Sequence, residues 1–109
     1  MTGRPYGEKV DLYDSSEFQV TTATTNYDVA ANQASWLANI KGYASGRCGA
    51  LDIITDQTIT VRFNKTTLPA ITITSSESPA RFEDIAISNV YITNTSGNTA
   101  NIKLRQFII

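Results

Sequence analysis

Large β-branched and aromatic residues alternate with polar ones along the middle of this chain, and this pattern strongly constrains the fold. Ile59, Val61 and Phe63 fall on one side of an extended chain, while the polar residues between them fall on the other. Successive side chains of a strand point to opposite faces, so the pattern indicates a strand with one buried and one solvated face. Similar alternation occurs at 71–74 and 89–93.

Turn-forming residues separate several segments of this kind. Threonine is the commonest residue and leucine is scarce, and β-branched side chains suit a pleated sheet better than a helix. Short strands at such close spacing are typical of sandwiches and barrels. We therefore predict an all-β fold, an antiparallel β-sandwich of about eight strands with jelly-roll or Ig-like topology. The expected strands are 18–24, 27–31, 51–54, 58–63, 71–74, 82–87, 89–93 and 99–109.

One segment, 35–44, breaks the strand pattern. Trp36, Leu37, Ile40 and Tyr43 follow the spacing of a helical stripe. A serine stands at the possible helix start and a glycine near its end. We expect one short helical turn here, closing one end of the domain.

The length of 109 residues indicates one domain. Residues 1–16 show neither period, and we interpret them as an extended N-terminal arm preceding a single sandwich domain at 17–109. Apolar residues scattered along such a segment favour docking on a partner over burial in the chain's own core. The arm residues expected at an interface are Tyr6, Val10, Leu12 and Tyr13.

The sequence offers little for catalysis. It contains no histidine and a single cysteine, Cys48, which removes the commonest general base and metal ligand and any intrachain disulfide. We predict a protein that is not an enzyme and takes no metal or cofactor. The net charge of −1 argues against nucleic acid as a partner, and the lack of a long apolar run argues against a membrane.

The C-terminal strand ends in an unusual way. Lys103 and Arg105 mark its solvated face, yet Phe107 and Ile109 follow on that same face. Either the Trp36 segment or a neighbouring subunit covers these two apolar residues. We expect a homo-oligomer, with a trimer as the first hypothesis, and Phe107 or Ile109 at the contact between copies.

Aromatic residues suggest a second kind of site. Trp36, Tyr43 and Tyr91, with Tyr27, are candidates for an aromatic platform that binds sugar, although most such residues belong to cores or subunit contacts.

Four stretches carry a family resemblance: "TTATTNYDVAANQ", "ITVRFN", "PAITI" and "NVYITNTSGNTANIKL". Together they resemble small β-sandwich or jelly-roll virion structural proteins of tailed bacteriophages, over about residues 21–104. The resemblance implies a non-enzymatic virion protein that folds in the host cytoplasm before assembly. A head decoration or cement protein on the major capsid protein is the first expectation. The alternatives are a carbohydrate- or receptor-binding module of a tail fibre or tip, and a neck, tail or fibre-anchoring accessory. The resemblance carries no active-site residue onto this chain.

Overall fold

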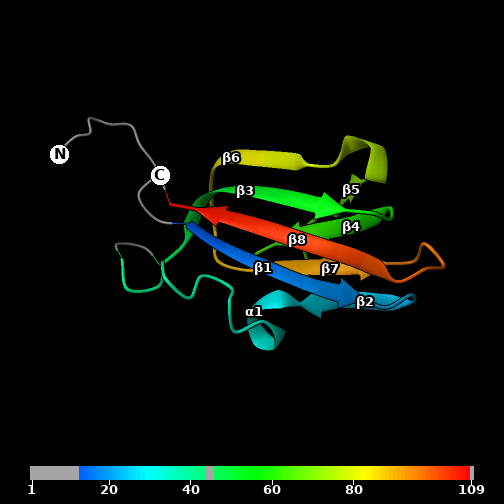
Figure 1. Cartoon of the computed structure of the whole chain (residues 1–109), viewed down its shortest axis with the longest axis horizontal. Helices are drawn as coiled ribbons and strands as arrows, with labels where there is room; N and C mark the ends of the chain where they lie inside the picture. The colour runs from blue at the N-terminus through cyan, green and yellow to red at the C-terminus, as the bar shows by residue number, and fades with distance from the viewer. Residues whose placement is uncertain (1–12, 44–45, 109) are drawn as a thin grey trace.

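The computed structural model describes residues 13–43 and 46–108. The chain forms two four-stranded antiparallel sheets that pack face to face (Figure 1). The predicted all-β sandwich is therefore confirmed. The strands are β1 (Tyr13–Val20), β2 (Thr24–Asp28), β3 (Cys48–Thr55), β4 (Ile59–Phe63), β5 (Ile71–Ile73), β6 (Ala80–Ile87), β7 (Val90–Asn94) and β8 (Ala100–Phe107). Two short helical segments accompany them, α1 (Val29–Asn32) and the 3-10 turn η1 (Ser75–Glu77).

The strand order is that of a jelly roll. One sheet has the order β1-β8-β3-β6 and the other the order β2-β7-β4-β5. The chain crosses between the sheets after every strand except β4, which pairs with β5 in the same sheet. This arrangement of two Greek keys distinguishes the fold from the Ig-like alternative. It also places the last strand, β8, between β1 and β3.

Strand β8 follows the predicted alternation. Ala100, Ile102 and Leu104 are buried between the sheets, while Lys103 and Phe107 lie on the opposite side and are partly exposed. The parity argument from the sequence is thus correct as far as Phe107. Ile109 lies outside the described residues.

The core fills the space between the two sheets with side chains from all eight strands, supplemented by the residues that follow β2. Its fully buried members include large aliphatic groups from both layers, each worth roughly 1.5–3 kcal/mol when removed from water. The largest are Trp36, Leu37, Ile40, Leu51, Ile53, Ile59, Ile73, Ile87, Ile92 and Leu104.

The region between β2 and β3 differs from the prediction. The second strand ends at Asp28, and Val29–Asn32 form the single turn of α1 where strand had been expected to continue. The Asp28 side chain accepts a hydrogen bond from the Ala31 amide at 3.1 Å, and Asn89 donates to Asp28 at 2.9 Å. Such capping favours a helical turn over further strand.

Residues 33–43, which we call the strap, form a series of turns instead of the expected helix. Leu37 adopts a left-handed backbone with φ 55°, which interrupts helical geometry. Trp36, Leu37 and Ile40 are nevertheless fully buried, so the apolar stripe was correctly identified as a plug at one end of the sandwich. Its Tyr43 is exposed.

Three polar contacts hold the strap against the sheets. The Leu37 amide donates to Gln106 Oε1 at 2.8 Å, and the Trp36 indole N–H donates to the Ser88 carbonyl at 3.0 Å. The backbone and side-chain nitrogens of Asn39 both donate to the Asp14 carboxylate, at 2.9 and 2.6 Å. These partners compensate for the backbone groups that a helix would have satisfied internally.

The boundary between arm and domain also needs correction. Residues 13–16, assigned to the arm, form the first half of β1 and pair with β8. Their inward-facing residues, Asp14 and Ser16, are polar and buried, so no apolar alternation marked this part of the strand. The other proposed arm contacts, Tyr6, Val10 and Leu12, lie outside the described residues. Within the described residues, no helix has the length and apolar character to cross a membrane.

Candidate functional site

The outer face of the β1-β8-β3-β6 sheet brings together residues from distant parts of the sequence. Strand pairing aligns Tyr13 with Phe107, Phe107 with Ala50, and Ala50 with Glu83. The neighbouring row contains Arg105, Asp52 and Arg81. Their positions were established by the same pairings.

Phe107 is covered in part by two side chains of its own chain. The Tyr13 ring lies 5.0 Å from the Phe107 ring, centroid to centroid, at an interplanar angle of 45°. The Arg81 guanidinium carbon lies 5.0 Å from the Phe107 centroid on the other side. Such a cation–π contact is worth about 0.5–1 kcal/mol at an exposed site. The proposed intrachain cover by Trp36 is wrong, because Trp36 lies in the core between the sheets.

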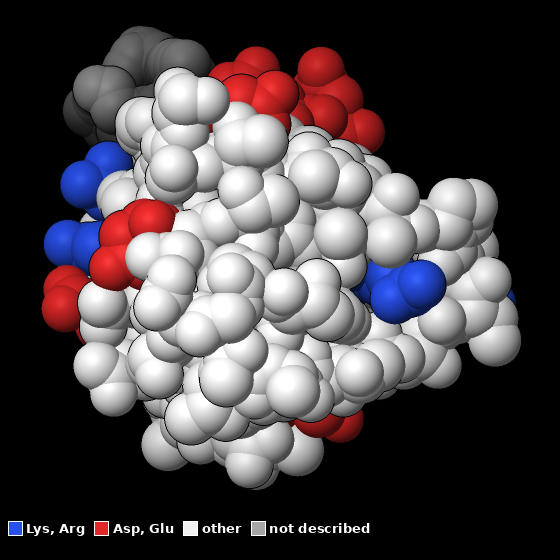
Figure 2. Space-filling model, turned by 90° about the vertical axis from the view of Figure 1, so that its right-hand side faces the viewer, with Lys and Arg blue, Asp and Glu red and all other residues white. Residues whose placement is uncertain are grey.

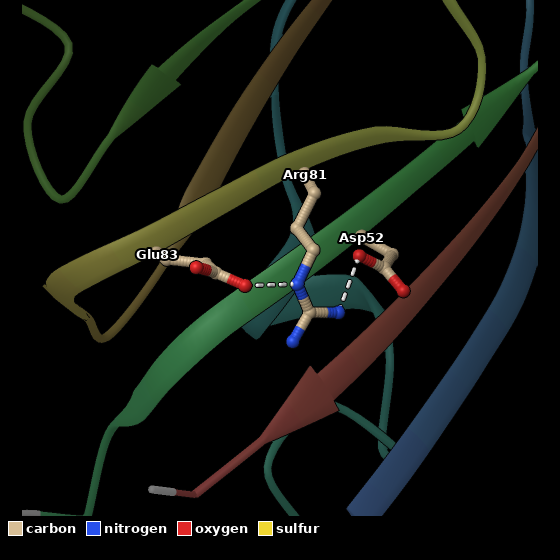
Figure 3. Close-up of polar contacts among 3 residues, drawn as sticks. All are labelled: Asp52, Arg81 and Glu83. Atoms are coloured by element: carbon tan, nitrogen blue, oxygen red, sulfur yellow. Dashed lines mark hydrogen bonds and ion pairs between the residues drawn. The ribbon is translucent and has the colours of Figure 1, made fainter.

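Two carboxylates hold the Arg81 guanidinium in this position (Figure 3). Arg81 Nη1 donates to Asp52 Oδ1 of β3 at 2.9 Å, and Arg81 Nε donates to Glu83, two residues along β6. The hydrogen bond with Glu83, followed by the interactions with Asp52, raises the pKa of Arg81 above its ordinary value. Since Arg81 and Glu83 are exposed, these pairs add little to stability. Their effect is to fix a planar cation beside an aromatic ring.

A shallow depression of about 280 Å³ lies further along the same face. Lys103 Nζ lies 3.3 Å from Glu17 Oε2 at its rim. Asp56 accepts hydrogen bonds from the Asn101 side chain at 2.7 Å and backbone amide at 2.8 Å, and these bonds lower the pKa of Asp56. The lining residues are Glu17, Ile54, Thr55, Asp56, Asn101, Ile102 and Lys103.

The proposed aromatic platform for sugar is not assembled. Trp36 has 0% of its surface exposed, so its ring is not available to a ligand. Tyr43 lies in the strap, whereas Tyr91 lies on the other sheet, paired with Arg62 across β4 and β7. Tyr27 stacks on Phe18 with ring centroids 5.4 Å apart.

Cys48 is a buried structural residue. Its thiol donates to the Ile87 carbonyl at 3.5 Å, and burial raises its pKa to about 12. A thiol in this state is a poor nucleophile, because the thiolate is the reactive form. Within residues 13–43 and 46–108, no group of three or more His, Cys, Asp or Glu side chains is placed to hold a metal ion.

Sequence reasoning identified Tyr13 and Phe107, which the structure brings into contact, but missed Asp52, Arg81 and Glu83. The period-2 rule does place Arg81 and Glu83 on one face of β6. Nothing local, however, indicates that β6 pairs with β3 and so brings Arg81 to Asp52. Comparison of the chain with protein-family models, curated proteins and solved structures found no match.

Proposed function

We propose that this protein is a non-enzymatic structural subunit of a tailed-phage particle, specifically a head decoration or cement protein that binds the major capsid protein. Two lines of support combine. The sequence from about residue 21 to 104 resembles small virion proteins of this kind. The outer face of the β1-β8-β3-β6 sheet carries a surface composed of residue types that are enriched at protein contacts.

The aromatic–arginine cluster of Tyr13, Phe107 and Arg81 is the observation that carries the proposal. Tyr13 is 45% exposed, and Arg81 is held rigidly beside Phe107 by its two carboxylate partners. Tyrosine and arginine are the residues most often found at energetic hot spots, and a side chain that is already ordered loses less entropy on binding. The cluster therefore suits a protein partner.

The charges on this face support a partner of low net charge. Lys103 is paired with Glu17, and Arg81 with Asp52 and Glu83. A face whose ions are largely paired internally exerts a weak field on its surroundings. A nucleic-acid backbone is accordingly a poor fit, and a capsid lattice of repeated protein subunits is a good one.

Purified particles provide the test. Particles are isolated from a culture in which the gene is expressed together with its neighbouring genes, and immunogold labelling locates the chain. We expect labelling over the head. Labelling confined to the neck or tail would contradict the decoration role, and a chain missing from purified particles would contradict a virion protein altogether.

A matched pair of variants links the role to the cluster. Tyr13→Ser with Phe107→Ser should fold but decorate particles much less than wild type. Leu68→Ser removes an apolar side chain of similar exposure, 46%, from a loop far along the chain and should decorate normally. Equal incorporation of both variants would show that the cluster is not the capsid contact.

A further inference from the structure

Two surfaces of opposite charge lie at opposite edges of the β1-β8-β3-β6 sheet. Strand β6 forms one edge, and its Glu83 and Asp84 are exposed; we call these two residues the β6 rim. The strap lies at the other edge, against β1, through the contact of Asn39 with Asp14. In Figure 1, β6 runs along the top of the molecule and the strap lies below the sheets.

The β6 rim is shaped by an irregularity in the strand. Cys48 pairs with Ile87 and Ala50 with Glu83, so β6 has two more residues than β3 between these pairs. Asp84 lies in this bulge with φ 61°, and a bulge re-aims the side chains of an edge strand. Figure 2 shows a group of acidic residues along this upper edge, where β6 and η1 run, above a largely uncharged end surface.

The opposite surface is basic and carries an exposed aromatic ring. Lys41, Tyr43 and Arg47, which we call the strap rim, are all exposed. Tyr43 is 55% exposed, more than any other large hydrophobic residue described. The buried strap residues and the Asn39–Asp14 contact fix the base of this rim, so its charges are presented from an anchored segment.

We infer that the strap rim of one copy binds the β6 rim of a second copy, head to tail. The charges of the two rims are complementary, which guides and aligns protein association. Glu83 stands in the same row as Ala50 and Phe107, so a strap docked at this edge reaches the Tyr13–Phe107 pair and covers it. Because the two surfaces differ, the contact is heterologous and closes into a ring, of which a trimer is a small example.

This inference deepens the proposed function, since a decoration subunit that repeats around a symmetry axis needs a contact between copies. The competing explanation is that Glu83 and Asp84 only guard an edge strand against unwanted pairing. The two explanations differ in one respect: a guarding role requires no basic partner on the opposite edge.

Charge reversal separates them. We expect the wild-type chain to sediment as an oligomer at micromolar concentration. Glu83→Lys with Asp84→Lys, or Lys41→Glu with Arg47→Glu, should each weaken self-association by about tenfold or more, because like charges then face each other. A chain carrying all four reversals should associate again. Raising salt from about 0.1 M to about 1 M should weaken the wild-type oligomer, since the screening length falls from about 10 Å to about 3 Å.

Controls keep the result interpretable. Glu17→Lys and Lys65→Glu change exposed charges outside both rims and should leave the oligomer mass unchanged. If Glu83→Lys disturbs folding by releasing Arg81, the neutral pair Glu83→Gln with Asp84→Asn replaces it and should also weaken association, to a smaller degree. Circular dichroism verifies the fold of every variant.

A monomeric wild-type chain, an oligomer unaffected by either reversal, or four reversals that fail to restore association would each overturn the inference. The outcome is independent of particle labelling. An oligomer that depends on both rims, made by a chain missing from particles, would refute the proposed function alone. Labelled heads with an oligomer insensitive to the rims would refute the inference alone.

Discussion

Replacing Gln106 with leucine tests how far the buried polar contacts hold the strap in place. Gln106 is fully buried; its Oε1 accepts from the Leu37 amide at 2.8 Å, and its Nε2 donates to Ser16 Oγ at 2.9 Å. Leucine fills a similar volume but provides neither group, so it leaves the buried Leu37 N–H without an acceptor. Such an orphaned group costs about 1–3 kcal/mol.

The remaining terms are smaller. Ser16 Oγ keeps its hydrogen bond from Ser35, so its loss is partial. Burying an apolar side chain in place of an amide offsets part of the cost. We expect Gln106→Leu to destabilise the protein by about 1–2 kcal/mol, equivalent to a fall in melting temperature of about 4–8 °C per kcal/mol for a domain of this size.

Urea unfolding monitored by the single tryptophan, Trp36, measures this change. Amide exchange at Leu37 should also accelerate. The matched control is Gln19→Leu, because Gln19 is exposed on the outer face of β1 and bonds only Asn101 there; it should alter stability by no more than about 0.5 kcal/mol. A Gln106→Leu variant as stable as wild type, with unchanged Leu37 exchange, would refute the reasoning.

Three further predictions concern single residues. Cys48 should resist thiol reagents in the folded protein at about pH 8 and react after unfolding in urea; because folding raises its pKa from 9.0 to about 12, its contribution to stability is present below pH 9.0 and lost as pH rises toward 12. Rapid labelling of the native protein would contradict this. Asp56→Asn should lower the urea midpoint slightly near neutral pH and not at strongly acid pH, since the lowered pKa of Asp56 makes its stabilisation available above the usual carboxyl pKa and lost as pH falls through the folded value; an equal difference at both pH values would count against it. Asn94→Ala should cost about 1–3 kcal/mol, because the buried Asn94 amide joins the Val20 and Asn98 carbonyls; calorimetry showing an unchanged melting temperature would exclude that role.

The faces of the strands could be predicted from the sequence, because the direction of a side chain in a strand depends only on its position along that strand. Ile59, Val61 and Phe63 are buried as predicted. For the same reason, counting along β8 placed Phe107 on the outer side, beyond Lys103. The inference required no knowledge of what β8 pairs with.

Where the alternation was polar, the local signal failed. Asp14 and Ser16 face inward, and their burial depends on hydrogen bonds from Asn39 and Ser35 of the strap. The strap in turn was read as helical, because the spacing of Trp36, Leu37 and Ile40 is compatible with a helix. Its turns depend on contacts with β1 and β8, which are remote in the sequence.

The sequence by itself therefore determined that the chain forms short antiparallel strands with defined inner and outer faces. Only the tertiary structure decided which strands are neighbours, and so which outward residues meet. Tyr13 reaches Phe107, and Arg81 reaches Asp52, through pairings of β1 with β8 and of β6 with β3. The physical reason is that strand geometry is a property of a few consecutive residues, whereas strand order follows from the apolar area that the whole chain buries when its distant segments pack together.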